Sequence, residues 1–455
     1  IYYAAVPLFL LGLSDGFLFL TPRIKQEEHN NLLLGGWLLG LFLGVLFYLF
    51  IILGGGKLFI NPENYTFVQR SLRVFAWYCF VTIPTAFLPN FFVATRRSLA
   101  MSVFVLFNAL SQLLSVILPI ALGWLDLPII FLFFAVTAAV KLLGWVIFTV
   151  WLYRDHTWNL NKNLIKKLLK FSVPLGLANV MQQLIRQVQG IIVSLLFTAS
   201  QFAIYSNAVF RLPFINIITG SAMSSLLPEL SRLNHKDQNH EAAKLWGKTT
   251  AKIATIIFPM FVVLFVFARP LTISLFSTKY MESVVLFRIW LLEMPLRISH
   301  YGNIVVSLGK RKLVLAGSAI QLFLHVTLGY IFANRWGVVG AVWAGTLGAY
   351  VLPVFYYLTS CRLMEVSPLS VFRWRFLFRT ALVALVSGGM SALVYFLQLP
   401  ELATLIVGGS VFIVLYFAIA LPTNVVQWQE IVHLWQIGLS RTRCRLKRLR
   451  KSQVR

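Results

Sequence analysis

The feature that most constrains this sequence is a series of long apolar runs. Each run has about 20 residues, the length that an α-helix needs to cross the hydrocarbon core of a bilayer. Loops between them are short except 54–70, 154–170 and 231–248, and none is long enough for a soluble domain. We therefore expect an all-α polytopic membrane protein. The thirteen runs lie at roughly 2–21, 32–53, 71–94, 99–122, 128–153, 171–196, 202–227, 249–268, 283–308, 313–333, 337–361, 376–397 and 402–421.

The composition agrees with a membrane class. Hydrophobic residues make up 59% of the chain, charged residues 12%, and the mean hydropathy is +0.80. Soluble domains have about 45–50% apolar and about 25% charged residues. The three cysteines, Cys79, Cys361 and Cys444, are scattered without metal-ligand spacing, so we expect no disulfide framework, no metal site and no cofactor.

Basic residues predict the topology. When loops are assigned alternately to two sides, 28 Lys and Arg fall on the side of the C-terminal tail and only five on the other. Cytoplasmic loops carry such an excess, so the tail is expected to be cytoplasmic. Thirteen spans then place Ile1 on the outer side, and we expect one further span before it, which makes fourteen in a 6 + 6 + 2 arrangement.

This arrangement divides the chain into five parts. The tail reads as an interfacial helix followed by a basic run that attracts anionic membrane lipids, at roughly 1 kcal/mol per cation. The parts are an N-terminal lobe with five spans (1–153), a basic cytoplasmic linker (154–170), a C-terminal lobe with six spans (171–361), two extra spans (362–421) and the tail (422–455).

Local motifs add a family resemblance. They include the linker WNLNKNLIKKLLKF, the run FSVPLGLANVMQQL that follows it, Tyr205-x-x-Ala208, the Gly309-Lys310 turn and Gly337-Val-Val-Gly340. With the 6 + 6 + 2 plan, these resemble the polysaccharide-transporter, or oligosaccharide-flippase, branch of the multidrug/oligosaccharidyl-lipid/polysaccharide exporter superfamily. Many relatives carry an acid near the end of the seventh helix, where this chain has Arg-Gln-Val-Gln at 186–189.

The resemblance implies a fold and a cargo. Two six-helix lobes would surround a central cavity that opens alternately to each side of a bacterial-type plasma (inner) membrane. The cargo would be an oligosaccharide on a polyprenyl diphosphate. Glycosyltransferases and a polysaccharide polymerase would act on the same cargo.

A polar stripe on the run 171–196 is the first candidate for cargo binding. At about 100° per residue, Asn179, Gln182, Gln183 and Arg186 fall on one helix face with Gly190. A membrane helix tolerates such a stripe only where it faces protein or water. Arginine matches phosphate geometry, so we expect these residues to line the cavity. The same amides also suit hydrogen bonds between helices, and that alternative stays open.

Other intramembrane charges complete the candidate set. Arg211 is expected to contact cargo. Arg297 follows Glu293 by four residues, with His300 on the same side, so these three form either a structural ion pair or a site linked to protons or cargo. Asp15, within Ser-Asp-Gly, either carries a proton or satisfies backbone groups near two glycines.

These charges bear on the function class. A cation-coupled multidrug antiporter of the same superfamily would need acids to dominate the cavity, yet the cations outnumber the acids. That antiporter and a flippase for the peptidoglycan lipid precursor remain the alternatives. The cations are Lys141, Arg186, Arg211, Arg288 and Arg297, and the acids are Asp15, Glu229 and Glu293.

Enzymes and nucleic-acid binders fit poorly. The chain has only 14 Asp and Glu, and its largest outer loop offers one acid, Glu63, so no paired catalytic carboxylates are expected. It also lacks a GxxxxGK[ST] motif for nucleotide phosphates. The net charge of +26 follows from topology, and no stacking aromatics accompany the charges of the tail. We therefore expect neither enzymatic activity nor nucleic-acid binding.

Overall fold

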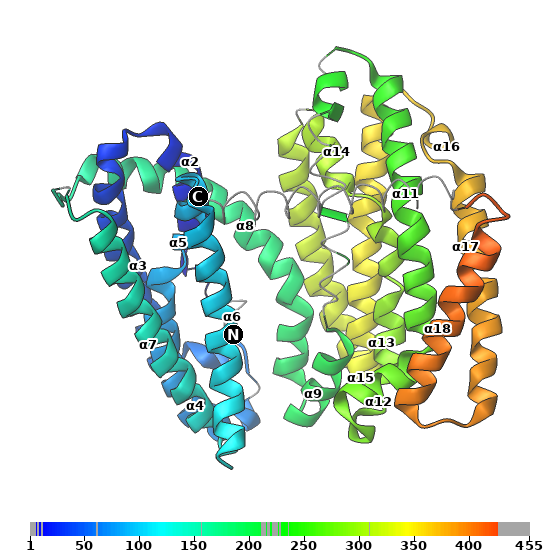
Figure 1. The fold of residues 1–455 in the computed structure, drawn as a ribbon, viewed down its shortest axis with the longest axis horizontal. Coiled ribbons are helices and arrows are strands. Elements are labelled where there is room, and N and C mark those ends of the chain that lie inside the picture. The colour runs from blue at the N-terminus through cyan, green and yellow to red at the C-terminus, as the bar shows by residue number, and fades with distance from the viewer. Residues whose placement is uncertain are drawn as a thin grey trace, which may run out of the picture. The chain divides into compact units, whose positions relative to one another are not determined.

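The computed structural model is helical, and no strand occurs among its described residues (Figure 1). It describes residues 6, 9–10, 12–60, 62–155, 157–210, 215, 219–220, 226, 229–234, 236–308 and 310–425. The interfacial helix and basic tail predicted after residue 425 lie outside these residues.

The α-helices are α2 (Leu13–Leu20), α3 (His29–Ile52), α4 (Pro62–Thr82), α5 (Leu88–Ala94), α6 (Ser98–Ala121), α7 (Leu127–Leu152), α8 (Lys162–Leu196), α9 (Ala199–Ala208), α11 (Asn239–Val266), α12 (Ala268–Phe276), α13 (Ser283–Leu291), α14 (Tyr301–Ser307), α15 (Arg311–Leu363), α16 (Pro368–Val371), α17 (Trp374–Ser391) and α18 (Glu401–Ala420). Short 3₁₀ helices are η1 (Thr21–Arg23), η2 (Gln26–Glu28), η3 (Gly55–Leu58), η4 (Ile83–Thr85), η5 (Thr278–Tyr280), η6 (Met294–Ile298) and η7 (Ala392–Leu397).

Eight segments in the described part are long and apolar enough to cross a membrane. They coincide with nine of the predicted runs, because one segment, Leu313–Leu363, contains two. The prediction of an all-helical multipass membrane protein is therefore confirmed. The segments are Gln26–Ile52, Val68–Ala94, Ser98–Ala121, Leu127–Leu152, Asn239–Val266, Leu313–Leu363, Trp374–Leu397 and Glu401–Ala420.

The remaining four runs have different outcomes. Runs 2–21 and 202–227 include residues outside the described part. Run 171–196 is the second part of α8, which begins at Lys162 and is not among the eight segments, so half of the predicted linker is helical and continuous with this run. Run 283–308 is not one helix, because it breaks at η6 between α13 and α14.

Helix α15 reverses direction at a glycine. The backbone of Trp336 and Gly337 leaves the helical range, and Gly337 has φ +65° and ψ −151°, a conformation open essentially to glycine alone. A Cβ on Gly340 would lie 2.0 Å from the carbonyl oxygen of Phe332, so the chain passes close to itself here. The two segments on either side match the predicted runs 313–333 and 337–361.

Contacts within the chain define two compact units. Unit 1 comprises Ile1–Phe202 with Ser318–Ala341, and unit 2 comprises Ala203–Gly317 with Val342–Arg455. Each unit has its own buried apolar clusters, and each is described here by itself.

Unit 1 is packed around aromatic side chains from α2, α3, α5 and α7. Phe17 stacks on Phe87 with ring centroids 4.3 Å apart, and Trp37 forms a T-shaped pair with Phe87 at a centroid distance of 5.4 Å. Gly40 of α3 lies against η4, where a Cβ would come within 2.7 Å of the Pro84 Cα. Small residues permit this close approach of membrane helices.

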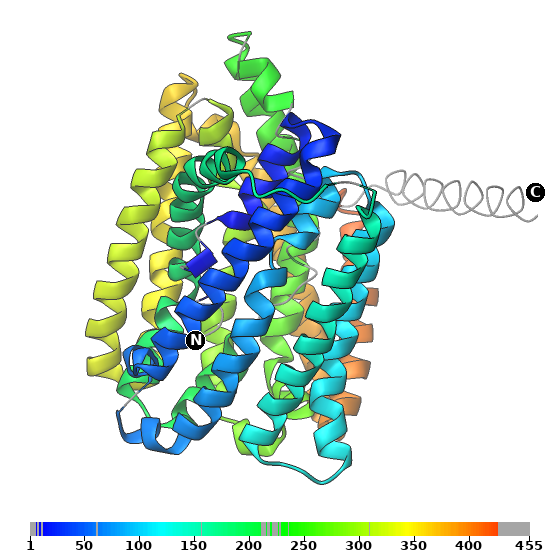
Figure 2. The same ribbon diagram turned by 90° about the vertical axis from the view of Figure 1, so that its left-hand side faces the viewer.

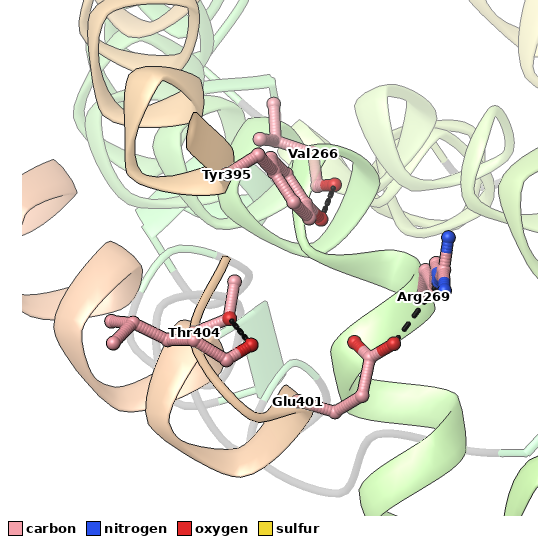
Figure 3. A network of polar contacts seen from close by, with 6 residues as sticks. Val266, Arg269, Tyr395, Glu401 and Thr404 are labelled. Atoms are coloured by element: carbon pink, nitrogen blue, oxygen red, sulfur yellow. Dashed lines mark hydrogen bonds and ion pairs between the residues drawn. The ribbon is translucent and has the colours of Figure 1, made fainter. Parts of the chain in front are cut away.

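In unit 2, α17 and α18 pack against α11 and α12. The apolar contact includes Val262, Val383, Phe412 and Tyr416, all nearly fully buried. Polar contacts support it at one end (Figure 3): the Tyr395 hydroxyl donates to the carbonyl of Val266 at 2.9 Å, and Arg269 Nε lies 3.1 Å from Glu401 Oε1.

The ion pair between Arg269 and Glu401 is expected to contribute little stability. Its side chains are 52% and 30% exposed, and exposed pairs are typically worth about 0.2–1 kcal/mol. Arg269→Ala should therefore lower the free energy of unfolding by less than about 1 kcal/mol, measured by thermal unfolding in detergent. A loss comparable to a buried-core truncation would contradict the exposed geometry.

Candidate functional site

Helix α8 carries most of the predicted polar stripe. Its start is capped by Asn161, whose side-chain oxygen accepts hydrogen bonds from the backbone N–H groups of Asn163 (3.0 Å) and Leu164 (3.2 Å). Such a cap satisfies amides that have no partner inside the helix. The helix then continues for 35 residues without a break and brings the stripe into unit 1.

Two glutamines of α8 bind the first segment of α15, within unit 1. Gln182 donates from Nε2 to Ser318 Oγ, and Gln189 donates to the backbone carbonyl of His325 at 3.2 Å. Gly329 allows the helices to meet, since a Cβ there would lie 2.8 Å from Gln189 Oε1. We call these five residues the α8–α15 seam. For Gln182, the interhelical hydrogen bond left open from the sequence is present.

Arg186 lies outside this seam. Its side chain is exposed, and its Nε and Nη2 atoms donate to Gln183 Oε1 at 3.0 and 2.6 Å. This pair of hydrogen bonds orients the guanidinium along α8. The structure thus divides the predicted stripe into a buried part that contacts α15 and an exposed cationic part.

Three of the predicted site residues lie wholly or partly outside the described residues. The side chain of Asn179 and the whole of Arg211 lie outside the described residues, and so does the side chain of Asp15. Their expected roles in cargo contact and proton transfer remain predictions.

The bond between Gln182 and Ser318 offers a test of the seam. Side-chain hydrogen bonds between membrane helices average about 0.6 kcal/mol by double-mutant cycles. A cycle of Gln182→Leu and Ser318→Ala should give a coupling energy of about 0.5–1.5 kcal/mol in thermal unfolding. Additive effects of the two substitutions would mean that the bond does not contribute.

The three candidate residues of unit 2, Glu293, Arg297 and His300, lie where the helix predicted for 283–308 breaks. Pro295 and the 3₁₀ helix η6 interrupt the helix, and Arg297 Nη2 lies 2.6 Å from Glu293 Oε1. Their side chains are 37% and 24% exposed, so the pair is half-buried. Of the two alternatives, the ion pair is present.

Side chains of α15 stabilise the break. Tyr350 donates to the carbonyl of Leu292 at 2.5 Å, and Thr346 donates to that of Ile289 at 3.3 Å. Broken helices inside membranes need such partners because water is absent there. His300 hydrogen-bonds the backbone of Thr219, while its Nε2 is buried without a hydrogen-bond partner among the described residues. Glu293, Arg297, His300 and Tyr350 form what we call the broken-helix cluster.

The sequence analysis did not identify several residues of these two sites. The clearest are Gln189 and its partner on α15, His325. Gln182 and Gln189 are seven residues apart, and so are Ser318 and His325. Seven residues are two helical turns, so each pair shares a face, and this matched spacing was a usable signal. Tyr350 gave no such signal, because its role depends on a backbone break 58 residues away.

The described part of the chain brings together no group of three or more His, Cys, Asp or Glu placed to hold a metal ion. Its polar chemistry is that of amides, hydroxyls and guanidinium groups on apolar helices. Such groups can bind phosphate and sugar hydroxyls.

Comparisons with known proteins agree on the fold class. A solved lipid II flippase MurJ, in an inward closed conformation, matches with a TM-score of 0.66 at 14% identity, over 92% of this chain and 91% of that one. An inward-facing multidrug resistance MATE family transporter of the MOP superfamily matches with a TM-score of 0.57 at 14% identity, over 79% and 87%. No curated protein matches the sequence. The chain therefore has the fold of MOP-superfamily transporters.

The family follows from a second comparison. A family model described as polysaccharide biosynthesis protein matches residues 25–285, more than half of the chain. The chain belongs to this family, as the motifs suggested, and is a multipass transmembrane protein with a transporter fold.

Proposed function

We propose that this protein flips polyprenyl-diphosphate-linked oligosaccharide units from the inner to the outer leaflet of a bacterial-type plasma membrane, for surface polysaccharide biosynthesis. The family supports the biosynthetic role, and the transporter fold supports movement of a molecule across the bilayer. Glycosyltransferases and a polysaccharide polymerase are the partners that such a step requires.

The observation that carries the proposal is the exposed Arg186 on α8. A charge within a membrane helix is costly unless it is solvated, paired or used. Gln183 holds two of its donor nitrogens, and the side chain remains exposed. A cation in this position favours an anionic cargo such as a diphosphate over a cationic drug.

The broken-helix cluster supports the transport mechanism. Discontinuous helices line binding sites in many secondary transporters, where the lobes expose the site alternately to each side. The break at η6 is held by side-chain hydrogen bonds from α15, so it is a built feature of unit 2. We assign it to cargo binding or to coupling of the transport step.

The proposed topology has a cytoplasmic C-terminus and a 6 + 6 + 2 plan of two lobes and two extra spans. It accounts for the 28-to-5 division of basic residues. The exposed Glu229 and Arg232 fit a cytoplasmic end of a helix, where the hydrogen bond from Arg232 lowers the pKa of the Glu229 carboxyl.

A second candidate is a flippase for the peptidoglycan lipid precursor, which the likeness to a lipid II flippase favours. The candidate functions can be told apart by which ligand stabilises the purified protein against unfolding. A ligand that binds only the folded state raises stability, by about 2.7 kcal/mol at 100 times its Kd. We expect the polyprenyl-diphosphate oligosaccharide to raise the Tm of the purified protein, and the sugar-free lipid to raise it less. Stabilisation only by the peptidoglycan precursor would favour the second candidate, and stabilisation only by a cationic dye would favour the antiporter.

A further inference from the structure

A groove lies between α6 and α7 in unit 1. These helices are joined by a short loop and lie side by side (Figure 2). They run antiparallel, because Ser115 hydrogen-bonds Thr137 at 2.8 Å while Lys141 hydrogen-bonds Asn108 at 2.6 Å. The groove has a volume of about 660 Å³ and a mostly apolar wall. Its lining includes Arg96, Arg97, Val140, Lys141, Gly144 and Leu152.

The depth of the groove matches one leaflet. It extends along α7 from Leu152 to Val140, twelve residues, which is about 18 Å at 1.5 Å per residue. Half of a hydrocarbon core is about 15 Å. Lys141 at the inner end is only 4% exposed and directs its amine to Asn108, so its methylene stem forms part of the wall.

Two arginines, Arg96 and Arg97, lie at the end of the groove that is opposite to Lys141. Arg97 is held over the ring of Tyr153, with its guanidinium carbon 5.3 Å from the ring centroid. Arg96 is exposed and has φ +57°, a strained backbone conformation for a residue other than glycine, in the turn before α6. No ion pair joins either arginine to an acid within the described residues.

We propose that this groove binds an anionic phospholipid of the leaflet at the arginine end, with its phosphate on Arg96 and Arg97 and an acyl chain along the groove. The cationic end selects a negative headgroup, and the apolar wall of one-leaflet depth fits a chain that starts at the membrane surface. A zwitterionic lipid would find the same wall but a weaker headgroup contact. None of its lining residues belongs to the α8–α15 seam or to the broken-helix cluster.

Photocrosslinking in nanodiscs tests the proposal. Phosphatidylglycerol and phosphatidylcholine with identical diazirine-bearing acyl chains are compared by mass spectrometry of the labelled peptides. We expect peptides of the groove to label at least about tenfold more with phosphatidylglycerol, at roughly 1 kcal/mol for each of the two arginines, while peptides around the exposed Ile406 and Ile413 of α18 label equally with both. An equal ratio at both places would overturn the proposal.

Matched variants locate the headgroup and the chain. Arg96→Gln and Arg97→Gln should each reduce the preference for phosphatidylglycerol roughly fivefold, whereas Arg154→Gln, outside the groove lining, should leave it unchanged. Gly144→Phe, which points into open space, should reduce groove labelling by both lipids, and the control Gly389→Phe should not. A preference that survives both arginine substitutions, or groove labelling displaced by a polyprenyl diphosphate instead of phosphatidylglycerol, would contradict the phospholipid assignment.

Discussion

Replacing Gly12 by alanine is expected to destabilise the protein by about 2–5 kcal/mol. Gly12 precedes α2 with φ +70°, which strains any residue with a Cβ by roughly 1–2 kcal/mol. An added Cβ would also lie 2.5 Å from the Gly176 Cα and 2.6 Å from the Ser172 carbonyl oxygen of α8. The neighbouring atoms are backbone and cannot move aside, so overpacking adds about 1–3 kcal/mol.

Gly123 is a matched control for this substitution. It has φ +75°, but no atom lies within 4 Å of its ideal Cβ. Gly123→Ala should therefore show only the backbone strain, and the difference between the two variants measures the close approach of α2 and α8. Thermal unfolding of both proteins in detergent provides the values. Equal losses of stability would contradict the packing of Gly12 on Gly176.

Arg186→Gln is expected to have the largest effect on transport. Hydrogen bonds to charged groups are worth about 1.5–3 kcal/mol, so loss of the contact to a diphosphate should slow glycolipid flipping by roughly 10- to 100-fold. Arg186→Lys keeps the charge but loses the fork of donors that matches phosphate, and should retain part of the activity. Gln183→Leu removes the acceptor that orients Arg186 and should have a smaller effect.

The control for these transport measurements is Arg269→Gln, which removes an exposed arginine from the pair with Glu401 (Figure 3). It should leave the flipping rate within a factor of two or so, since the pair contributes little stability. Equal rates for wild type and Arg186→Gln, with folded protein recovered in both, would remove Arg186 from the cargo site.

Helices that are defined by their own length and apolarity were predictable from the sequence. Runs such as 99–122 and 402–421 match α6 and α18 within a few residues, because span length and apolarity are properties of the segment itself. The break in run 283–308 was not predicted. Pro295 alone permits a kink, but a stable break also needs Tyr350 and Thr346 from a distant helix.

In the candidate site, too, local features were predictable from the sequence and contacts between distant helices were not. The helical period predicts which polar side chains of α8 share a face, but it does not tell which of them contact another helix. Gln182 contacts Ser318, 136 residues away, while Gln183 instead binds Arg186 on its own helix. Such outcomes depend on which face α15 covers, and periodicity within one segment carries no information about that.

Movement of a lipid-linked oligosaccharide between leaflets is the function that we propose for this protein. The most direct measurement uses proteoliposomes containing a fluorescent polyprenyl-diphosphate oligosaccharide and a quencher that cannot cross the membrane. With the protein present, quenching should proceed beyond the outer-leaflet fraction toward completion, and Arg186→Gln should slow this second phase. Quenching that stops at the outer-leaflet fraction would contradict the flippase function. If the same vesicles also expel a cationic dye when a proton gradient is applied, the protein is a drug antiporter.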